Sequence, residues 1–123
     1  MKKIYGLILL LFFITGTINV SAYNKEHTAD LKGNPDKFIL NQNYPNPFNP
    51  ETKISFSLPK PANITIKVYD IMGGEVATLI NNEKKSAGSH QISFDAVNLP
   101  SGIYFYRLLS DNFSESKKMI LIK

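Results

Sequence analysis

From residue 38 onward, apolar and polar side chains alternate with a period of two over short stretches. The clearest stretch runs from Ile64 to Tyr69, where Ile, Ile and Val alternate with Thr, Lys and Tyr. Such alternation is typical of strands that bury one face. The pattern predicts strands that begin near residues 53, 63, 75, 91, 103 and 115, and a short additional strand over Phe38–Leu40.

The residues between these stretches favour turns. Met72–Glu75 contains two glycines and predicts a tight hairpin turn, and Leu99–Gly102 matches a type I turn with Pro second and Gly fourth. Asn81–Ser89 is polar and predicts a longer loop, whereas Asp111-Asn112 predicts a short turn. Strands spaced by about 8–12 residues are typical of β-sandwiches. We therefore expect residues 38–123 to form an all-β, immunoglobulin-like β-sandwich of about seven short antiparallel strands.

The first 22 residues follow a different pattern. Two lysines precede the apolar run Ile4–Ile14, and the segment ends in Val20-Ser21-Ala22. This is the pattern of a secretory signal peptide, with cleavage predicted between Ala22 and Tyr23. The apolar run is shorter than the roughly 20 residues that a spanning helix needs, so we expect no stable membrane span. Residues 23–37 are polar and without a period, and they predict a flexible linker.

Composition narrows the classes of function. The 123 residues include no Cys, which excludes disulfides, thiolate metal ligands, a cysteine nucleophile and a lipoprotein anchor. Removal of the signal peptide takes away two lysines and no acid, so the net charge falls from +4 to +2. That balance does not favour nucleic-acid binding. Ser89-His90 lacks a nucleophile elbow, and the carboxylates lie scattered at turns. We expect no enzyme, no metal and no cofactor.

The segment Asn43–Pro50 holds three prolines within six residues. Proline fixes φ and restricts the residue before it, so the segment is predicted to be stiff. Two interpretations stay open at this point. The segment is either a rigid edge over the sandwich with Phe48 tucked in, or an epitope that loses little entropy when a receptor binds it.

The segment Gln42–Thr52 resembles the opening of the type A C-terminal sorting domain of type IX secretion, also called the Por secretion system. That system belongs to the Bacteroidetes and neighbouring phyla. Three further blocks resemble this family in the same order: Val68–Val76, Leu99–Leu108 and Ser116–Lys123. One departure is Gly74, where the family usually has a polar or basic residue, so we expect a looser hairpin there.

The resemblance implies a sorting signal rather than a catalyst. The Sec translocon and signal peptidase would bring such a protein to the periplasm, and the type IX outer-membrane translocon would recognise the folded domain. A sortase-like C-terminal peptidase usually removes the domain, and the cargo is released or attached at the cell surface. We expect Tyr104 to lie mainly in the core. The candidate sorting-signal residues are Pro45, Asn46, Pro47, Phe48, Asn49, Pro50, Gly73, Gly102, Tyr104, Lys118 and Lys123.

The region between Ala22 and the first family block is short. Its fewer than 20 residues are too few to fold alone. One hypothesis is therefore a secreted sorting module with almost no cargo, or the remnant of a larger gene. The other is a retained, surface-exposed immunoglobulin-like module for binding or adhesion.

Overall fold

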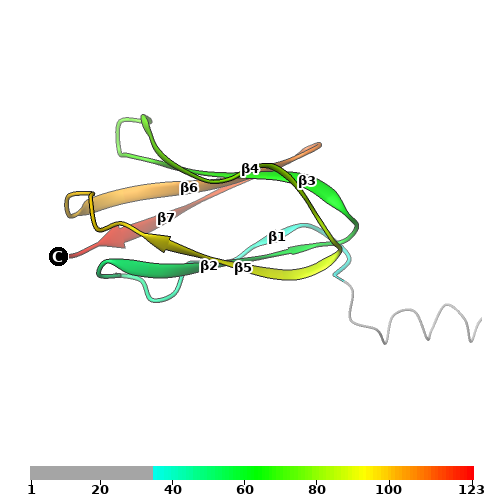
Figure 1. Ribbon diagram of the computed structural model, residues 1–123, viewed down its shortest axis with the longest axis horizontal. Helices are drawn as coiled ribbons and strands as arrows, with labels where there is room; N and C mark the ends of the chain where they lie inside the picture. The colour runs from blue at the N-terminus through cyan, green and yellow to red at the C-terminus, as the bar shows by residue number, and fades with distance from the viewer. Residues whose placement is uncertain (1–34) are drawn as a thin grey trace, which may run out of the picture. The chain divides into compact units, whose positions relative to one another are not determined.

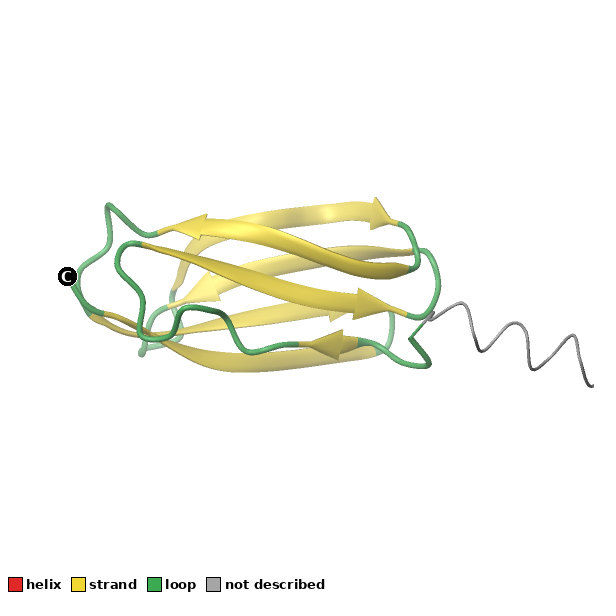
Figure 2. Ribbon diagram, turned by 90° about the horizontal axis from the view of Figure 1, so that it is seen from below, coloured by secondary structure: helices red, strands yellow, loops and turns green. Residues whose placement is uncertain are grey.

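The computed structural model describes residues 35–123, which form two packed antiparallel sheets (Figures 1 and 2). One sheet has the strand order β1-β2-β5 and the other has the order β4-β3-β6-β7. The strands are β1 (Ile39–Leu40), β2 (Glu51–Leu58), β3 (Ala62–Tyr69), β4 (Glu75–Lys85), β5 (Gly88–Asp95), β6 (Gly102–Ser110) and β7 (Phe113–Leu121). The predicted seven-stranded β-sandwich is confirmed. The predicted signal peptide and all of the linker before Pro35 lie outside the described residues.

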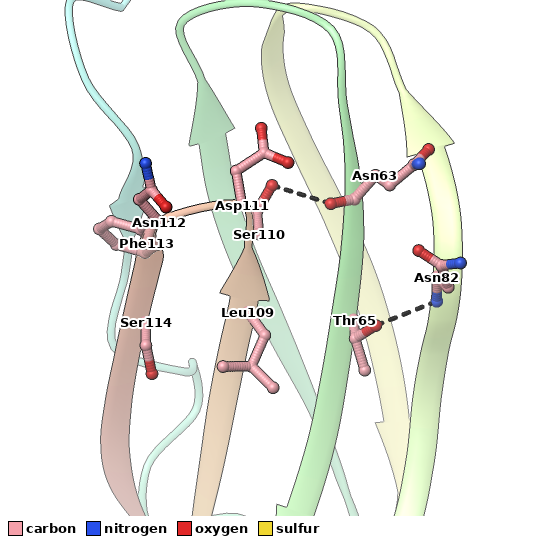
Figure 3. Close-up of a pocket in the computed structure, with 9 residues that line it drawn as sticks. All are labelled: Asn63, Thr65, Asn82, Leu109, Ser110, Asp111, Asn112, Phe113 and Ser114. Atoms are coloured by element: carbon pink, nitrogen blue, oxygen red, sulfur yellow. Dashed lines mark hydrogen bonds between the residues drawn. The ribbon is translucent and has the colours of Figure 1, made fainter.

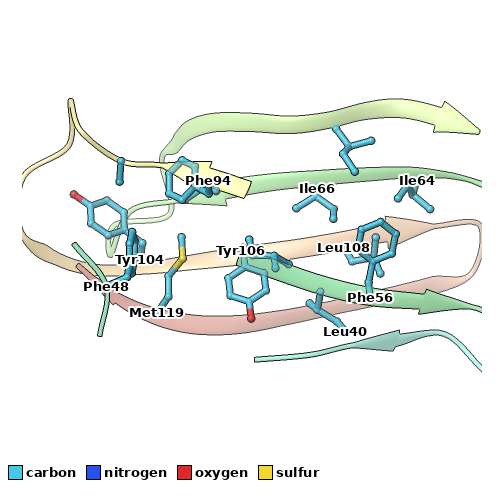
Figure 4. Close-up of a cluster of buried hydrophobic side chains, with 14 of the residues drawn as sticks. Leu40, Phe48, Phe56, Ile64, Ile66, Phe94, Tyr104, Tyr106, Leu108 and Met119 are labelled. Carbon is cyan, nitrogen blue, oxygen red and sulfur yellow. The ribbon is translucent and has the colours of Figure 1, made fainter. Parts of the chain in front are cut away.

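The core forms because strands from the two sheets bury every second side chain toward each other (Figure 4). In β2 the buried apolar residues are Ile54, Phe56 and Leu58, and in β3 the buried positions run from Ala62 to Val68. Residues 59–61 carry the chain from the first sheet to the second. Two prolines in this short connection end β2 and turn the chain. The alternation seen in the sequence therefore fixes which faces meet.

The predicted loop over Asn81–Ser89 is wrong. Strand β4 continues to Lys85, and only Ser86 and Ala87 separate it from β5. The polar half of β4 pairs with β3 through its backbone, with Lys85 opposite Ala62. Because β4 lies at the edge of its sheet, this pairing needs no alternating apolar residues.

The β3–β4 turn is tightly held, so the expectation of a looser hairpin at Gly74 is wrong. Asp70 Oδ1 accepts the N–H groups of Met72 at 2.9 Å and Gly74 at 2.8 Å. Gly73 has φ +87, a conformation that glycine adopts without strain. A β carbon at Gly74 would lie 3.1 Å from Asp70 Oδ2. Glycine at this position therefore leaves room for the Asp70 carboxylate to fold back over the turn.

The type I turn predicted at Leu99–Gly102 is displaced by three residues. The hydrogen-bonded turn runs from Ala96 to Leu99, whose N–H donates to the Ala96 carbonyl at 3.0 Å. Asp95 Oδ1 accepts the Val97 N–H, and this side-chain bond places the turn earlier than the proline suggested. The Tyr104 hydroxyl then donates to the Pro100 carbonyl at 2.6 Å. A tyrosine bonded to the backbone just upstream is a hallmark of immunoglobulin-like sandwiches.

Tyr106 joins the two sheets at the centre of the core. Its side chain is fully buried, and its hydroxyl donates to the Asn41 carbonyl at 2.6 Å, just after β1. Burial raises the pKa of Tyr106 to about 12. The folded protein therefore keeps this hydroxyl protonated at a pH where the unfolded chain loses the proton.

We predict that Tyr106 makes the fold sensitive to alkali. The unfolded chain ionises this residue near pH 10.0, so its stabilising contribution is complete below that pH and is lost as the pH rises toward about 12. The loss amounts to about 2–3 kcal/mol of unfolding free energy. Urea denaturation of the protein and of Tyr106→Phe between about pH 9 and about pH 12 measures it. The variant should show the flatter profile, and parallel profiles would contradict the prediction.

Candidate functional site

Residues Gln42–Pro50, which we call the lead-in segment, cross from one sheet to the other. Tyr44 pairs with Lys53 of β2 through two backbone hydrogen bonds of 2.9 Å. Phe48 pairs with the end of β7, donating to the Ile120 carbonyl at 2.9 Å and accepting the Ile122 N–H at 3.0 Å. In Figure 1 this segment loops out before β2, at the end of the sandwich that carries the C-terminus. The lead-in segment therefore closes the gap between the two sheets at this end.

A buried polar cluster sets the path of the lead-in segment. Asn43 is almost fully buried, and its Nδ2 donates to Thr52 Oγ1 at 3.0 Å and to the Pro45 carbonyl at 3.1 Å. The Thr52 hydroxyl also donates to the Pro45 carbonyl, at 2.9 Å. Within residues 35–123, no buried side-chain polar atom lacks a partner. A fully paired buried cluster holds its backbone in one arrangement, here the bend at Pro45.

The side chains of the lead-in segment divide into an anchor and a displayed surface. Phe48 is only 2% exposed, and its ring lies 6.2 Å from that of Phe94 in the core (Figure 4). Tyr44 is 80% exposed. Beside Tyr44, which was not a predicted site residue, four of the candidate residues are exposed: Pro45, Asn46, Pro47 and Asn49, with Pro50 half-buried. The interpretation with Phe48 tucked in is confirmed, and the exposed neighbours leave the receptor epitope as a prediction.

The lead-in segment and β7 are joined by further bonds. Asn46 Oδ1 accepts the Ile120 N–H at 3.0 Å, and Gln42 Nε2 donates to the Lys118 carbonyl at 2.7 Å. The Lys118 side chain is exposed and lies opposite Phe105 on the outer face of the second sheet. Lys123 donates through its N–H to Ser101 Oγ and through Nζ to the Val97 carbonyl. The first and last family blocks thus form one surface.

The remaining candidates have different roles. Tyr104 is buried, as expected, and acts through packing and its bond to Pro100. Gly102 opens β6 opposite Leu121, and a β carbon there would lie 3.9 Å from the Tyr104 ring, so packing does not demand glycine. Gly73 lies in the β3–β4 turn, and β6 and β7 separate this turn from the lead-in segment. Ala22 and Tyr23 are outside the described residues.

Strand register places the lead-in segment, the β3–β4 turn, residues 96–101 and residues 121–123 at one end of the sandwich. We call this the lead-in end. The large apolar side chains that are exposed within residues 35–123 all lie at or beside it: Tyr44, Ile71, Met72, Val97, Ile103 and Ile122. Single exposed apolar residues are ordinary, but here they are distributed over one end of the sandwich, which makes this end a candidate interaction surface.

Two shallow hollows flank the lead-in end. One of about 340 Å³ lies on the first sheet, between Tyr44, Pro45 and Lys53. The other, of about 290 Å³, lies on the second sheet between Phe105, Gly73 and Tyr69, with the Arg107 guanidinium 5.2 Å from the centre of the Tyr69 ring. These hollows offer apolar, aromatic and cationic contacts, which suit recognition of another macromolecule.

Sequence reasoning did not single out Gln42, Asn43 and Thr52 as contributors to this surface. A signal for Thr52 was present, because the buried alternation of β2 extends backward from Leu58 and places Thr52 in the interior. A buried threonine needs a polar partner nearby, and Asn43 is that partner. The sequence held no comparable signal for Gln42, whose bond reaches β7 across 76 residues.

These features define a small β-sandwich whose exposed large apolar side chains, within residues 35–123, lie at or beside one end. The chain belongs to the family of secretion system C-terminal sorting domains, whose model matches residues 42–123. The resemblance to sorting domains of type IX secretion is thereby confirmed, and the family supports a role in sorting for export. No curated protein matches this chain. Within residues 35–123 there is no helix long and apolar enough to span a membrane, and no group of three or more His, Asp or Glu that could hold a metal ion.

We predict that Phe48 anchors the lead-in segment and the sandwich together. Phe48→Ala removes a fully buried ring and should lower the free energy of unfolding by about 3–5 kcal/mol. Tyr44→Ala is the matched control in the same segment, and its exposed ring should change the stability by no more than about 0.5 kcal/mol. Urea denaturation followed by circular dichroism measures both variants. Equal losses in the two would show that the anchor is not at Phe48.

Proposed function

We propose that the lead-in end is the surface by which the type IX outer-membrane translocon recognises this domain. The observation that carries this proposal is a coincidence of position. The lead-in segment, the β3–β4 turn, the start of β6 and the end of β7 belong to the four family blocks, and all four lie at the end of the sandwich that carries the exposed apolar side chains. Selection for a core alone would not collect exposed apolar residues at one end.

The rigidity of this surface supports the same proposal. The displayed residues Tyr44–Pro47 are held by backbone bonds to β2 and β7 and by the buried Asn43–Thr52 pair. A preorganised surface loses little conformational entropy on binding. Lys118 and Lys123 lie beside the apolar residues and add positive charge for an acidic part of the receptor.

The proposed route has three stages. The Sec translocon exports the chain, and signal peptidase cleaves after Ala22. The type IX translocon then transfers the folded domain across the outer membrane. A sortase-like C-terminal peptidase removes the domain, and the remainder is released or attached at the cell surface. The alternative, a sandwich retained at the surface as a binding module, differs only in the last stage.

We predict that residues 34–123 suffice to export a reporter. Fused to a reporter that has a signal peptide, in a host with type IX secretion, they should move the reporter to the surface or medium. The same fusion in a translocon-deficient host should leave it in the periplasm. Cell fractionation and immunoblotting measure location and tail size together. A reporter that stays periplasmic in the competent host would refute the sorting role, and a delivered reporter that keeps its tail would favour the retained module.

Surface variants test whether the translocon recognises the lead-in end. Ile71→Ser with Met72→Ser removes two strongly exposed apolar side chains, and we expect export to fall by about tenfold. Lys84→Ser with Asn112→Ser changes exposed residues away from this end and should leave export unchanged. Both pairs are exposed, so circular dichroism should show folded domains. Equal export from both would place recognition elsewhere.

We predict that the exported chain begins at Tyr23. Small residues before the cleavage point admit the peptidase, so Ala22→Leu should block processing at this position. Mass spectrometry of the protein from the periplasm measures the N-terminus. A mature protein that still begins at Met1 would contradict the signal peptide, whereas export followed by cleavage at another bond would contradict only the predicted site.

A further inference from the structure

The end of the sandwich opposite the lead-in end carries a polar hollow of about 390 Å³ (Figure 3). We call it the amide hollow, because three of its nine lining residues are asparagines. Strands β3, β4, β6 and β7 all contribute to it. Its lining residues are Asn63, Thr65, Asn82, Leu109, Ser110, Asp111, Asn112, Phe113 and Ser114.

The backbone around the amide hollow is fixed by two bonds (Figure 3). Ser110 Oγ donates to the Asn63 carbonyl at 2.8 Å, and Thr65 Oγ1 accepts the Asn82 N–H at 3.1 Å. Asn82 and Asp111 have φ values of 50 and 43, a left-handed conformation that Asn and Asp tolerate better than most residues. The frame of the hollow is therefore set without using its side-chain amides.

The amide side chains of the hollow remain free to bind. Within residues 35–123, the side chains of Asn63, Asn82 and Asn112 make no hydrogen bond to protein. Each amide offers two donors and an acceptor. A sugar hydroxyl is also both donor and acceptor, so amides match it better than a purely cationic or anionic group does.

The hollow also has an apolar strip between its polar groups. On the outer face of the second sheet, Leu109 lies directly between Thr65 of β3 and Ser114 of β7. At the rim, the ring of Phe113 is held by stacking on Phe38, with 5.1 Å between ring centres. A pyranose ring presents C–H groups on its faces and hydroxyls around its edge. The hollow likewise combines an apolar side chain, Leu109, with amides and hydroxyls around it.

We propose that the amide hollow binds a neutral saccharide. Within residues 35–123, its only charged lining residue is Asp111, which accepts hydrogen bonds and disfavours anions. An extended peptide is recognised chiefly by adding to a free strand edge. The hollow instead lies over the faces of β3, β6 and β7, whose backbones are paired with each other. This activity goes beyond sorting, and it sits at the end that the proposed export surface leaves open.

The test is an NMR titration of the ¹⁵N-labelled protein that keeps residues 35–123 intact, before any removal of the sorting domain, with methyl glycosides of glucose, galactose and mannose. We expect at least one glycoside to bind with a dissociation constant on the order of 1 mM, since the hollow is open and shallow. The backbone N–H signals that shift should be those of Asn63, Asn82, Asp111 and Asn112. Glycerol, a polyol without a ring, should not saturate the same shifts.

Variants identify the binding groups. Asn63→Ala removes an exposed amide that makes no bond to protein, and it should weaken binding by about fivefold or more. Asn98→Ala removes an exposed amide at the other end and should have no effect. The proposal is overturned if no glycoside shifts these amides, if the shifts fall at the lead-in end, if both variants bind alike, or if an extended peptide binds the hollow and the glycosides do not. Export of the reporter fusion is measured separately, so either proposal can fail alone.

Discussion

The structure depends on the lead-in segment, which closes the gap between the two sheets at one end of the sandwich. An uncovered strand edge exposes backbone groups and permits pairing with other chains. Here the lead-in segment bonds to β2 through Tyr44 and to β7 through Phe48, while the Phe48 ring enters the core between the sheets. One segment therefore supplies backbone pairing on both sheets and part of the apolar interior. Pro45 and Pro47, which flank the paired residues Tyr44 and Phe48, have no N–H and so cannot donate a hydrogen bond to either sheet.

This closure makes the two ends of the sorting signal interdependent. Gln42 and the Lys118 carbonyl are separated by 76 residues in the chain and by 2.7 Å in the fold. A receptor that contacts both the lead-in segment and the end of β7 can bind only the folded domain, since an unfolded chain does not bring them together. Loss of the Phe48 anchor would disperse the surface even though every residue that it displays were still present.

The sequence predicts those elements whose signal is local. Alternating residues identified β2, β3 and β6, and the glycines identified the β3–β4 turn. For the polar half of β4 the sequence predicts a loop, because a strand at the edge of a sheet can be held by backbone pairing with β3 and then needs no buried apolar face. Pro100 favours a turn at Leu99–Gly102, but the hydrogen bond from the Val97 N–H to Asp95 places the turn at Ala96–Leu99 instead. The Asn43–Thr52 pair and the amide hollow depend on residues brought together by the sheets, and no short window contains them.

The two ends of the sandwich are also independent in a physical sense. The side chains of the amide hollow are mostly exposed and lie over the outer face of the sheet, whereas the lead-in end is tied to the core through Phe48 and Tyr104. Exposed substitutions that avoid buried groups usually change stability little. Asn63 and Asn112 can therefore vary without moving Phe48, the lead-in segment or β7. A domain built this way can keep one recognition surface constant while a second surface acquires, changes or loses a ligand.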